Sequence, residues 1–369
     1  MLITDKTALK KFYSPNRLWQ GIPGIEVTAK GRLFCAFYSG GRCEEYGNYC
    51  VLVSSDDDGL SWSEPIAAIY HGENARCYDP CLWMDPLGRL WFFWAVSPDH
   101  AAWATVCDKP DAQNLQWSDP FLIAPEVMMN KPIVLRNGDY LLPISVWDAE
   151  IRKIKNASPT ERRPFVYRSR DKGKTFEKLG GPLVEDRSFD EHMVVERKDG
   201  SLLMLTRTEY GIGKSLSFDG GLTWSDAVGS GLKGPSSRFH LRRLNKGEIL
   251  LINHHNFNGR NNLTAMISDD ECETWKGFLT IDERDNVSYP DSAQTQDGTI
   301  YIVYDRERGA NARSLQEVLK DPREILLAKV SVEDILAGKL VSPGSCLKSV
   351  VSKLGDYKGT LKDPYKRIE

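Results

Sequence analysis

Two residues that could form a nucleophile and its base share a spacing in this 369-residue chain. Tyr289 lies nine residues before Gly298, and Glu191 lies nine residues before Gly200. A tyrosine hydroxyl, whose ordinary pKa is about 10, needs an adjacent base before it can attack a substrate at neutral pH. If both glycines mark equivalent turns, the two side chains emerge at the same depth of the fold and could act together.

The glycines belong to a pattern of apolar strand, polar hairpin and apolar strand that recurs six times. The hairpin glycines are Gly31, Gly88, Gly138, Gly200, Gly247 and Gly298. Successive glycines are 57, 50, 62, 47 and 51 residues apart, which fits one four-stranded antiparallel blade per repeat. The sequence therefore predicts an all-β fold, a six-bladed β-propeller that forms a single domain over residues 1–369. Residues 323–330 are expected as the outer strand of the last blade, and residues 346–369 as a polar C-terminal tail.

A second repeat, Ser-x-Asp-x-Gly-x-Ser/Thr followed by an aromatic residue, occurs after the predicted third strand of blades 1, 3, 4 and 5. The copies cover residues 55–62, 169–176, 217–224 and 268–275, and Cys272 replaces the glycine in the last. Each copy follows an apolar run, so it predicts a strand that enters a self-bonding turn. This repeat indicates structure rather than chemistry. The charged segment 149–163 is expected to be a long loop.

Composition narrows the classes of partner. The net charge of −3 and the pI near 6.1 give no broad electrostatic reason to expect nucleic-acid or membrane partners. No apolar stretch approaches the roughly 20 residues that span a bilayer, and the N-terminus lacks the features of a signal peptide. The eight cysteines form no CxxC pair and are expected as small buried hydrophobes in a reducing compartment. We therefore expect a cytoplasmic location.

Both repeats together resemble the sialidase (neuraminidase) superfamily of glycoside hydrolases, over roughly residues 15–340. The segment from Glu191 to Arg207 is similar to the family's Glu-x-x-Val-Val-Glu…Gly-x-Leu…Arg segment. The resemblance implies that Glu191 activates the nucleophile and that Arg207 is one of three arginines that hold a substrate carboxylate. The segment 288–304 is similar to the family's Tyr-Ser-x-Leu…Asp-Gly-x-Ile…Leu-Tyr-Glu segment, which implies that Tyr289 is the nucleophile.

Further polar residues are expected to bind substrate. Arg260 leads into the fourth copy of the turn motif and resembles the third family arginine, while Arg238 competes with it for that role. The remaining candidates stand at or near the starts of predicted innermost strands: Asp79, His240 and Asp291. We expect no cofactor and no metal, with a divalent ion held by His192, His240 and Asp291 as an open alternative.

Two departures from the family pattern affect the expected site. Gly21 stands where the family's Arg-Ile-Pro motif has its first arginine, so one bidentate contact to a carboxylate is missing. Arg17 could replace it only by a different backbone path, and the glutamate that steadies that arginine in the family falls on Asp305. The family's acid/base aspartate is also missing from residues 40–47, where Glu45, or Glu44, could supply the proton.

Three functions are compatible with these residues. The first is an exo-glycoside hydrolase, resembling sialidases, that removes a terminal acidic sugar from a small oligosaccharide or glycoside. The alternatives are a non-catalytic carbohydrate-binding propeller and a glycan lyase that uses a tyrosine and a histidine such as His240. Contact between Tyr289 and Glu191, with cations opposite, would favour an enzyme, whereas a Tyr289 covered by hydrophobic neighbours would favour the binding protein.

Overall fold

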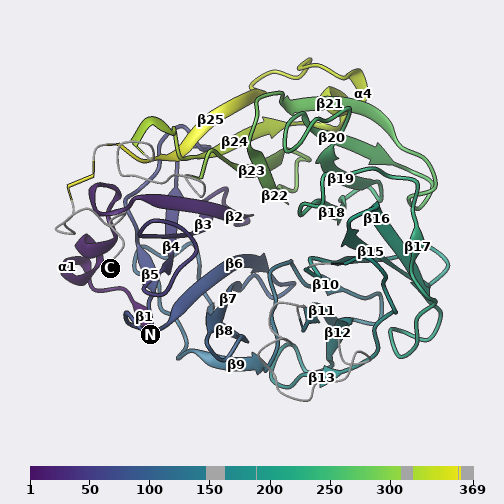
Figure 1. Cartoon of the computed structure of the whole chain (residues 1–369), viewed down its shortest axis with the longest axis horizontal. Coiled ribbons are helices and arrows are strands. Elements are labelled where there is room, and N and C mark those ends of the chain that lie inside the picture. The colour runs from purple at the N-terminus through teal and green to yellow at the C-terminus, as the bar shows by residue number, and fades with distance from the viewer. Residues whose placement is uncertain (147–162, 188, 309–318, 356, 359–369) are drawn as a thin grey trace, which may run out of the picture.

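The computed structural model describes residues 1–146, 163–187, 189–308, 319–355 and 357–358. Six antiparallel sheets stand around a common centre, which we call the central channel, and from its innermost strand each sheet runs outward in chain order, with β1 added at the outer edge of the first (Figure 1). The predicted all-β, six-bladed propeller is confirmed. Within the described residues, no helix is long and apolar enough to cross a membrane.

Each blade has four strands, and blade 1 carries an additional edge strand. Blade 1 contains β2 (Trp19–Val27), β3 (Leu33–Gly40), β4 (Tyr49–Ser55) and β5 (Ala67–Ile69), with β1 (Leu2–Ile3) outside β5. Blade 2 contains β6 (Arg76–Met84), β7 (Leu90–Ser97), β8 (Ala101–Cys107) and β9 (Phe121–Ala124). Blade 3 contains β10 (Ile133–Val134), β11 (Tyr140–Ser145), β12 (Pro164–Ser169) and β13 (Glu177–Lys178).

The second half of the chain builds the other three blades. Blade 4 contains β14 (Met193–Glu196), β15 (Leu202–Thr208), β16 (Gly211–Ser217) and β17 (Val228–Gly229). Blade 5 contains β18 (His240–Arg243), β19 (Ile249–His254), β20 (Leu263–Ser268) and β21 (Lys276–Asp282). Blade 6 contains β22 (Val287–Gln294), β23 (Ile300–Arg306), β24 (Glu324–Val330) and β25 (Cys346–Lys353). The short helices are α1 (Lys6–Leu9), η1 (Lys10–Phe12), η2 (Ser14–Asn16) and α4 (Val332–Ala337).

The last strand corrects the expected end of blade 6. Residues 346–353 form β25, which pairs with β24, so β24 is the third strand and not the outermost one. Most of β25 is only partly buried, as suits an edge strand, and this polar character made the segment resemble a tail. The rest of the expected tail, residues 359–369, and nearly all of the loop 149–163 lie outside the described residues.

The turn motifs act as predicted, at the ends of β4, β12, β16 and β20. In the third copy, Asp219 accepts hydrogen bonds from the Thr223 hydroxyl at 2.5 Å and the Ser217 hydroxyl at 2.9 Å. These bonds, the one from Thr223 first, lower the pKa of Asp219 to about 2. Ser217 in turn accepts the amide of Gly221, whose φ is +97°. Cys272 holds the corresponding left-handed conformation in the fourth copy, with φ 72°.

The ring closes between its first and last blades. Blade 1 is built from residues 2–69 and blade 6 from residues 287–353, so closure depends on side chains that cross between β2 and β22–β23. Asp305 accepts the amide of Ile22 at 2.7 Å, and Asp291 accepts the amide of Ile25 at 2.8 Å. Hydrophobic residues of both blades pack into one core behind these bonds. We call this contact the closing seam.

Candidate active site

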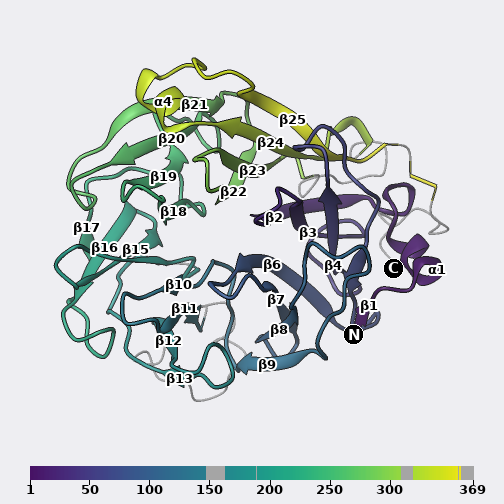
Figure 2. The same ribbon diagram turned by 180° about the vertical axis from the view of Figure 1, so that it is seen from behind.

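The six inner strands define two ends of the central channel. Each begins at one end, the strand-start end, and leads into a hairpin at the other, the hairpin end (Figures 1 and 2). A single cavity confirms the shared direction, because hairpin residues from four consecutive blades line it: Pro86, Arg136, Lys198 and Gly247. Residues at the starts of the inner strands therefore lie at the opposite end of the channel from residues of the hairpins.

A β-bulge recurs at the strand-start end of three inner strands. The register with the second strand shifts between Gly21 and Gly24 in β2, between Tyr78 and Cys81 in β6, and between Ser288 and Asp291 in β22. One residue inside each bulge has a positive φ and precedes a proline: Ile22 (56°), Asp79 (49°) and Tyr289 (54°). Positive φ is unfavourable for such residues, and bulges redirect side chains beside functional sites. The unfavourable backbone conformation at Asp79 and Tyr289 therefore sets the direction of their side chains.

The structure brings Tyr289 and Glu191 together, as their equal spacing from the hairpin glycines predicts. The Tyr289 hydroxyl donates to Glu191 Oε1 at 3.4 Å, and Arg207 Nη1 lies 2.9 Å from Glu191 Oε2. All three side chains are buried. Burial, followed by the charge of Glu191, raises the pKa of Tyr289 to about 12, although nearby guanidinium groups oppose the rise. The phenol is therefore neutral at physiological pH and hydrogen-bonded to a carboxylate that can accept its proton.

The ring of Tyr289 is packed while its hydroxyl is engaged. Tyr289 is 7% exposed and belongs to a hydrophobic cluster that includes Trp19 and Ile22. Two guanidinium groups also lie over its ring, that of Arg308 at 4.9 Å and that of Arg260 at 5.5 Å from the centroid. The hydrophobic neighbours expected of a binding protein and the nearby cations expected of an enzyme are thus both present around Tyr289.

Arg308 is a site residue that the sequence analysis missed. It follows β23 and lies outside any repeated motif, and its Nη1 atom is 3.2 Å from Glu44 Oε1. Its Nε atom is 3.8 Å from Asp305 Oδ2, so the position that steadies an arginine in the family contacts an arginine here too. Arg17, considered as a replacement for the missing arginine, instead bonds Gln20 and Ser352 between the blades. The available sequence signal was the pairing of Gly21 with Asp305.

The two candidate acids occupy different settings. Glu45 turns back on its own loop, where Oε1 accepts the amide of Arg42 at 2.8 Å and Oε2 lies 3.2 Å from its guanidinium. Asp79, expected to bind substrate, is buried at the start of blade 2. Burial first, and then the charges of Glu44 and Glu191, raise the pKa of Asp79 to about 8 against the opposing effect of Arg76. Asp79 therefore carries a proton at neutral pH.

Three further expected ligands, Arg238, His240 and Asp291, form a group with Lys131 that we call the channel cluster, and Lys131 and His240 also line the cavity at the hairpin end. Asp291 lies 3.1 Å from Lys131, 3.2 Å from His240 Nδ1 and 3.7 Å from Arg238. Burial alone would raise the pKa of Asp291, but these neighbours hold it below its ordinary value. Burial lowers the pKa of His240 to about 4, so this imidazole is neutral. The structure does not bring these residues to the Tyr289 hydroxyl in any recorded contact.

The open alternative of a metal ion finds no ligand set in the described residues. There, no group of three histidine, cysteine, aspartate or glutamate side chains lies close enough to hold an ion. His192, one of the residues considered, is buried with Nε2 2.7 Å from the carbonyl oxygen of Phe165. Its imidazole therefore holds neighbouring strands together.

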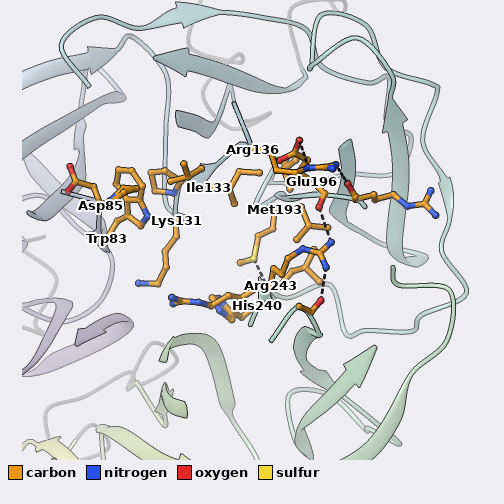
Figure 3. Close-up of a pocket in the computed structure, with 18 of the residues that line it drawn as sticks. Trp83, Asp85, Lys131, Ile133, Arg136, Met193, Glu196, His240 and Arg243 are labelled. Atoms are coloured by element: carbon orange, nitrogen blue, oxygen red, sulfur yellow. Dashed lines mark hydrogen bonds and ion pairs between the residues drawn. The ribbon is translucent and has the colours of Figure 1, made fainter. Parts of the chain in front are cut away.

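The hairpin end contains a cavity of about 600 Å³ (Figure 3). Two of its arginines face carboxylates: Arg136 Nε lies 3.3 Å from Glu196, and Arg243 Nη2 lies 2.5 Å from Glu271. No tyrosine, serine, threonine or cysteine is among the described residues that line it. The cavity thus lacks the nucleophile and base found at the strand-start end.

Comparison with known proteins agrees with this fold. Residues 31–302 match the model of the BNR repeat-like domain family. Similar solved structures include the leech intramolecular trans-sialidase, 16% identical with a TM-score of 0.67, which covers 89% of this chain and 70% of that one. The intramolecular trans-sialidase of Ruminococcus gnavus is 14% identical with a TM-score of 0.65, covering 88% and 96%. A protein of unknown function from Dyadobacter fermentans is 20% identical with a TM-score of 0.62, covering 78% and 90%.

At these identities the solved structures show a common fold and not a common reaction. No curated protein matches the chain. The family model, however, spans well over half of the sequence, and the sialidases share the propeller described above. The chain therefore belongs to the BNR repeat-like domain family, and it shares its propeller fold with these sialidases.

Proposed function

We propose that this protein is an exo-acting glycoside hydrolase that removes a terminal acidic sugar through Tyr289. One observation carries the proposal: the Tyr289 hydroxyl donates to Glu191 at 3.4 Å, while Arg207 holds the other oxygen of that carboxylate at 2.9 Å. A nucleophile, its base and a group that orients the base are thereby arranged in one line of contacts.

The reaction has two balanced halves. In the first, Glu191 takes the phenolic proton as the Tyr289 oxygen bonds to the anomeric carbon, and the glycosidic C–O bond breaks as its oxygen receives a proton from an acid. In the second, water attacks the anomeric carbon, the tyrosyl–sugar bond breaks, and the proton on Glu191 returns to Tyr289. The water's remaining proton restores the acid. A neutral phenol suits an anionic sugar because a carboxylate nucleophile would be repelled by it.

The charges around Tyr289 support an acidic substrate. Arg207, Arg260 and Arg308 all lie close enough to oppose the rise in the pKa of Tyr289. Arg207 is balanced by Glu191, but no carboxylate in the described residues lies within ion-pair distance of Arg260. Converging cations of this kind attract an anionic ligand. The leech enzyme, which shares the fold, is described in complex with 2,7-anhydro-Neu5Ac.

Two carboxyl groups are candidates for the acid. Glu45 would have to leave Arg42 before it could reach a substrate. Asp79 already carries a proton at neutral pH and stands at the same bulge position in blade 2 as Tyr289 does in blade 6. We favour Asp79. Glu45→Gln and Asp79→Asn separate them, because only loss of the acid removes the alkaline limb of the pH–rate profile on substrates with poor leaving groups.

The proposal is tested by an activity screen with aryl glycosides of sialic, uronic and neutral sugars. Turnover of an acidic glycoside is expected, with its loss in Tyr289→Phe. Tyr301→Phe is the matched control, because Tyr301 belongs to the same blade and donates to Asp58 away from the site. Hydrolysis that survives Tyr289→Phe would reject the mechanism. An unsaturated product would indicate the lyase, and binding without turnover of any glycoside would indicate the carbohydrate-binding propeller.

A further inference from the structure

Gly21 leaves a space at the strand-start end that Arg308 fills. A Cβ atom at position 21 would lie 2.3 Å from Arg308 Cδ and 2.9 Å from Asp305 Oδ2, far closer than real Cβ contacts. The backbone of Gly21 does not have the positive φ that favours glycine, so the close approach of the arginine is what excludes a side chain here. Gly21 and Arg308 therefore form a complementary pair across the closing seam.

The buried carboxylate beneath Arg308 is fixed. Asp305 is fully buried and accepts the Ile22 amide at 2.7 Å and the Ser288 hydroxyl at 2.6 Å. Its Oδ2 atom lies 3.8 Å from Arg308 Nε, on the stem side of the guanidinium. The guanidinium itself lies 4.9 Å from the Tyr289 ring centroid and 5.9 Å from that of Trp19. Asp305 and the rings of Tyr289 and Trp19 thus orient the guanidinium group of Arg308 from its Nε side. Its terminal nitrogen atoms remain available to another partner.

The partner of the terminal nitrogen atoms of Arg308 is Glu44, which is partly exposed and not buried like Asp305. Glu44 lies 3.2 Å from Arg308 Nη1 and 4.0 Å from Arg76 Nη1, and its side chain is 41% exposed on the loop between β3 and β4. Because Glu44 is partly exposed, water competes with Arg308 for its carboxylate, and the pair contributes less free energy than a fully buried one would. A second carboxylate of better geometry could take the place of Glu44 on Arg308.

We infer that Arg308, in the space left by Gly21, binds the carboxylate of the acidic sugar, and that Glu44 is its exchangeable counter-ion in the free protein. The inference rests on the proposed function for the identity of the site, and it names the group that recognises the substrate's charge. A planar guanidinium suits this task because it contacts both carboxylate oxygens. The arginine that is missing at position 21 in β2 is thereby supplied by the segment that follows β23 in blade 6.

The test is a calorimetric titration with N-acetylneuraminic acid and glucuronic acid, each compared with its uncharged methyl ester. Arg308→Ala should weaken binding of the acid about 10- to 100-fold, as loss of a charge-assisted contact does, and leave binding of the ester unchanged. Arg308→Lys, which keeps the charge but loses the fork, should fall between. Arg136→Ala at the hairpin end is the matched control and should bind the acid normally. Equal loss for acid and ester, no loss, or no binding of either acid to the parent would each overturn the inference.

Three further variants test the pair and its counter-ion independently of how stable Arg308→Ala is. Gly21→Arg should lose acid binding, because the new stem collides with Arg308, whereas Gly21→Arg combined with Arg308→Gly should regain it. Glu44→Gln should tighten acid binding several-fold by removing the competing carboxylate. Unchanged acid binding in Glu44→Gln would reject the exchange.

The result can be separated from that of the proposed function with Tyr289→Phe. This variant should lose turnover and keep Arg308-dependent binding of the acid. Acid binding that depends on Arg308 in a protein without turnover would reject the hydrolase and keep the inference. Turnover of acidic glycosides that is unaffected by Arg308→Ala would do the reverse.

Discussion

The two ends of the channel are built from the same inner strands, yet they present different groups. The hairpin end has the cavity of about 600 Å³, where Arg136 and Arg243 face carboxylates and Lys131 and His240 also line the wall. The strand-start end holds a phenol in contact with a carboxylate, beneath guanidinium groups from three blades. Strand β14 makes the comparison direct, because Glu191 just precedes it and Glu196 ends it, each paired with an arginine.

The largest expected effect comes from this matched pair of glutamates. Glu191→Gln should lower kcat on an acidic aryl glycoside about 10²- to 10⁴-fold, because the phenol of Tyr289 loses its base. Glu196→Gln should leave kcat within about twofold, since its contact with the exposed Arg136 is a surface ion pair. Steady-state kinetics of both variants decide the matter. A larger loss in Glu196→Gln would move the chemistry to the hairpin end.

The channel cluster between the two ends should respond in stability. Asp291→Ala leaves Lys131 and Arg238 without their shared buried carboxylate and should lower the free energy of unfolding by about 3 to 5 kcal/mol. Arg136→Ala at the hairpin end should change it by less than about 1 kcal/mol, because that side chain is more than half exposed. Chemical denaturation measures both. Similar values for the two variants would contradict the distinction between cluster and cavity.

Asp79 should give the strand-start end a pH dependence of stability. Its pKa rises from the model-compound value of 3.8 to about 8 in the folded protein, mainly through burial. Between these values the folded state holds a proton that the unfolded state has released, so stability falls as pH rises from about 4 to about 8. Asp79→Asn should flatten this part of the curve, measured as the melting temperature at pH 5, 6, 7 and 8. The same slope in parent and variant would show that Asp79 is not the group responsible.

The smallest effect is expected from the turn motifs, which lie at the C-terminal ends of the third strands. Asp219→Ala removes the acceptor for Thr223 and Ser217 in an exposed turn and should lower stability by about 1 kcal/mol. Turnover per folded molecule should stay unchanged, because the third strand runs parallel to the inner strand and ends away from Tyr289. Thermal melting and kinetics on the same sample test this. A specific loss of kcat would show that the turns influence the site.

The sequence was sufficient to predict the blades of the propeller because the pattern of strands and hairpins repeats. Six hairpin glycines fixed the number of blades, and the equal spacing of Glu191 and Tyr289 from two of them predicted their meeting. Features that occur once were not predicted. Arg308 stands outside any repeat and reaches the site only because β23 ends beside Gly21, which no local pattern shows. The polar strand β25 was mistaken for a tail because an edge strand needs only one buried face.

The bulges are an intermediate case, present in the sequence but not recognised. Ile22, Asp79 and Tyr289 each precede a proline at the same place in an inner strand. A residue before proline is restricted to extended conformations in most settings, so the pattern alone suggested ordinary strands. Only the three-dimensional register showed that each holds a positive φ and turns its side chain. Their common occurrence in blades 6, 1 and 2 marks the sector that surrounds the closing seam.

The closing seam makes the site dependent on completion of the ring. Tyr289, Asp305 and Arg308 come from the last blade and the Ile22 amide and Gly21 from the first, so no fragment of fewer blades contains the site. During synthesis the last blade must be completed before the first one gains its partner across the seam. A ligand that bridges Arg308 and Arg207 would in turn link blade 6 to blade 4 across the centre of the ring. Its binding would therefore slow the opening of the whole propeller and not merely the motion of one loop.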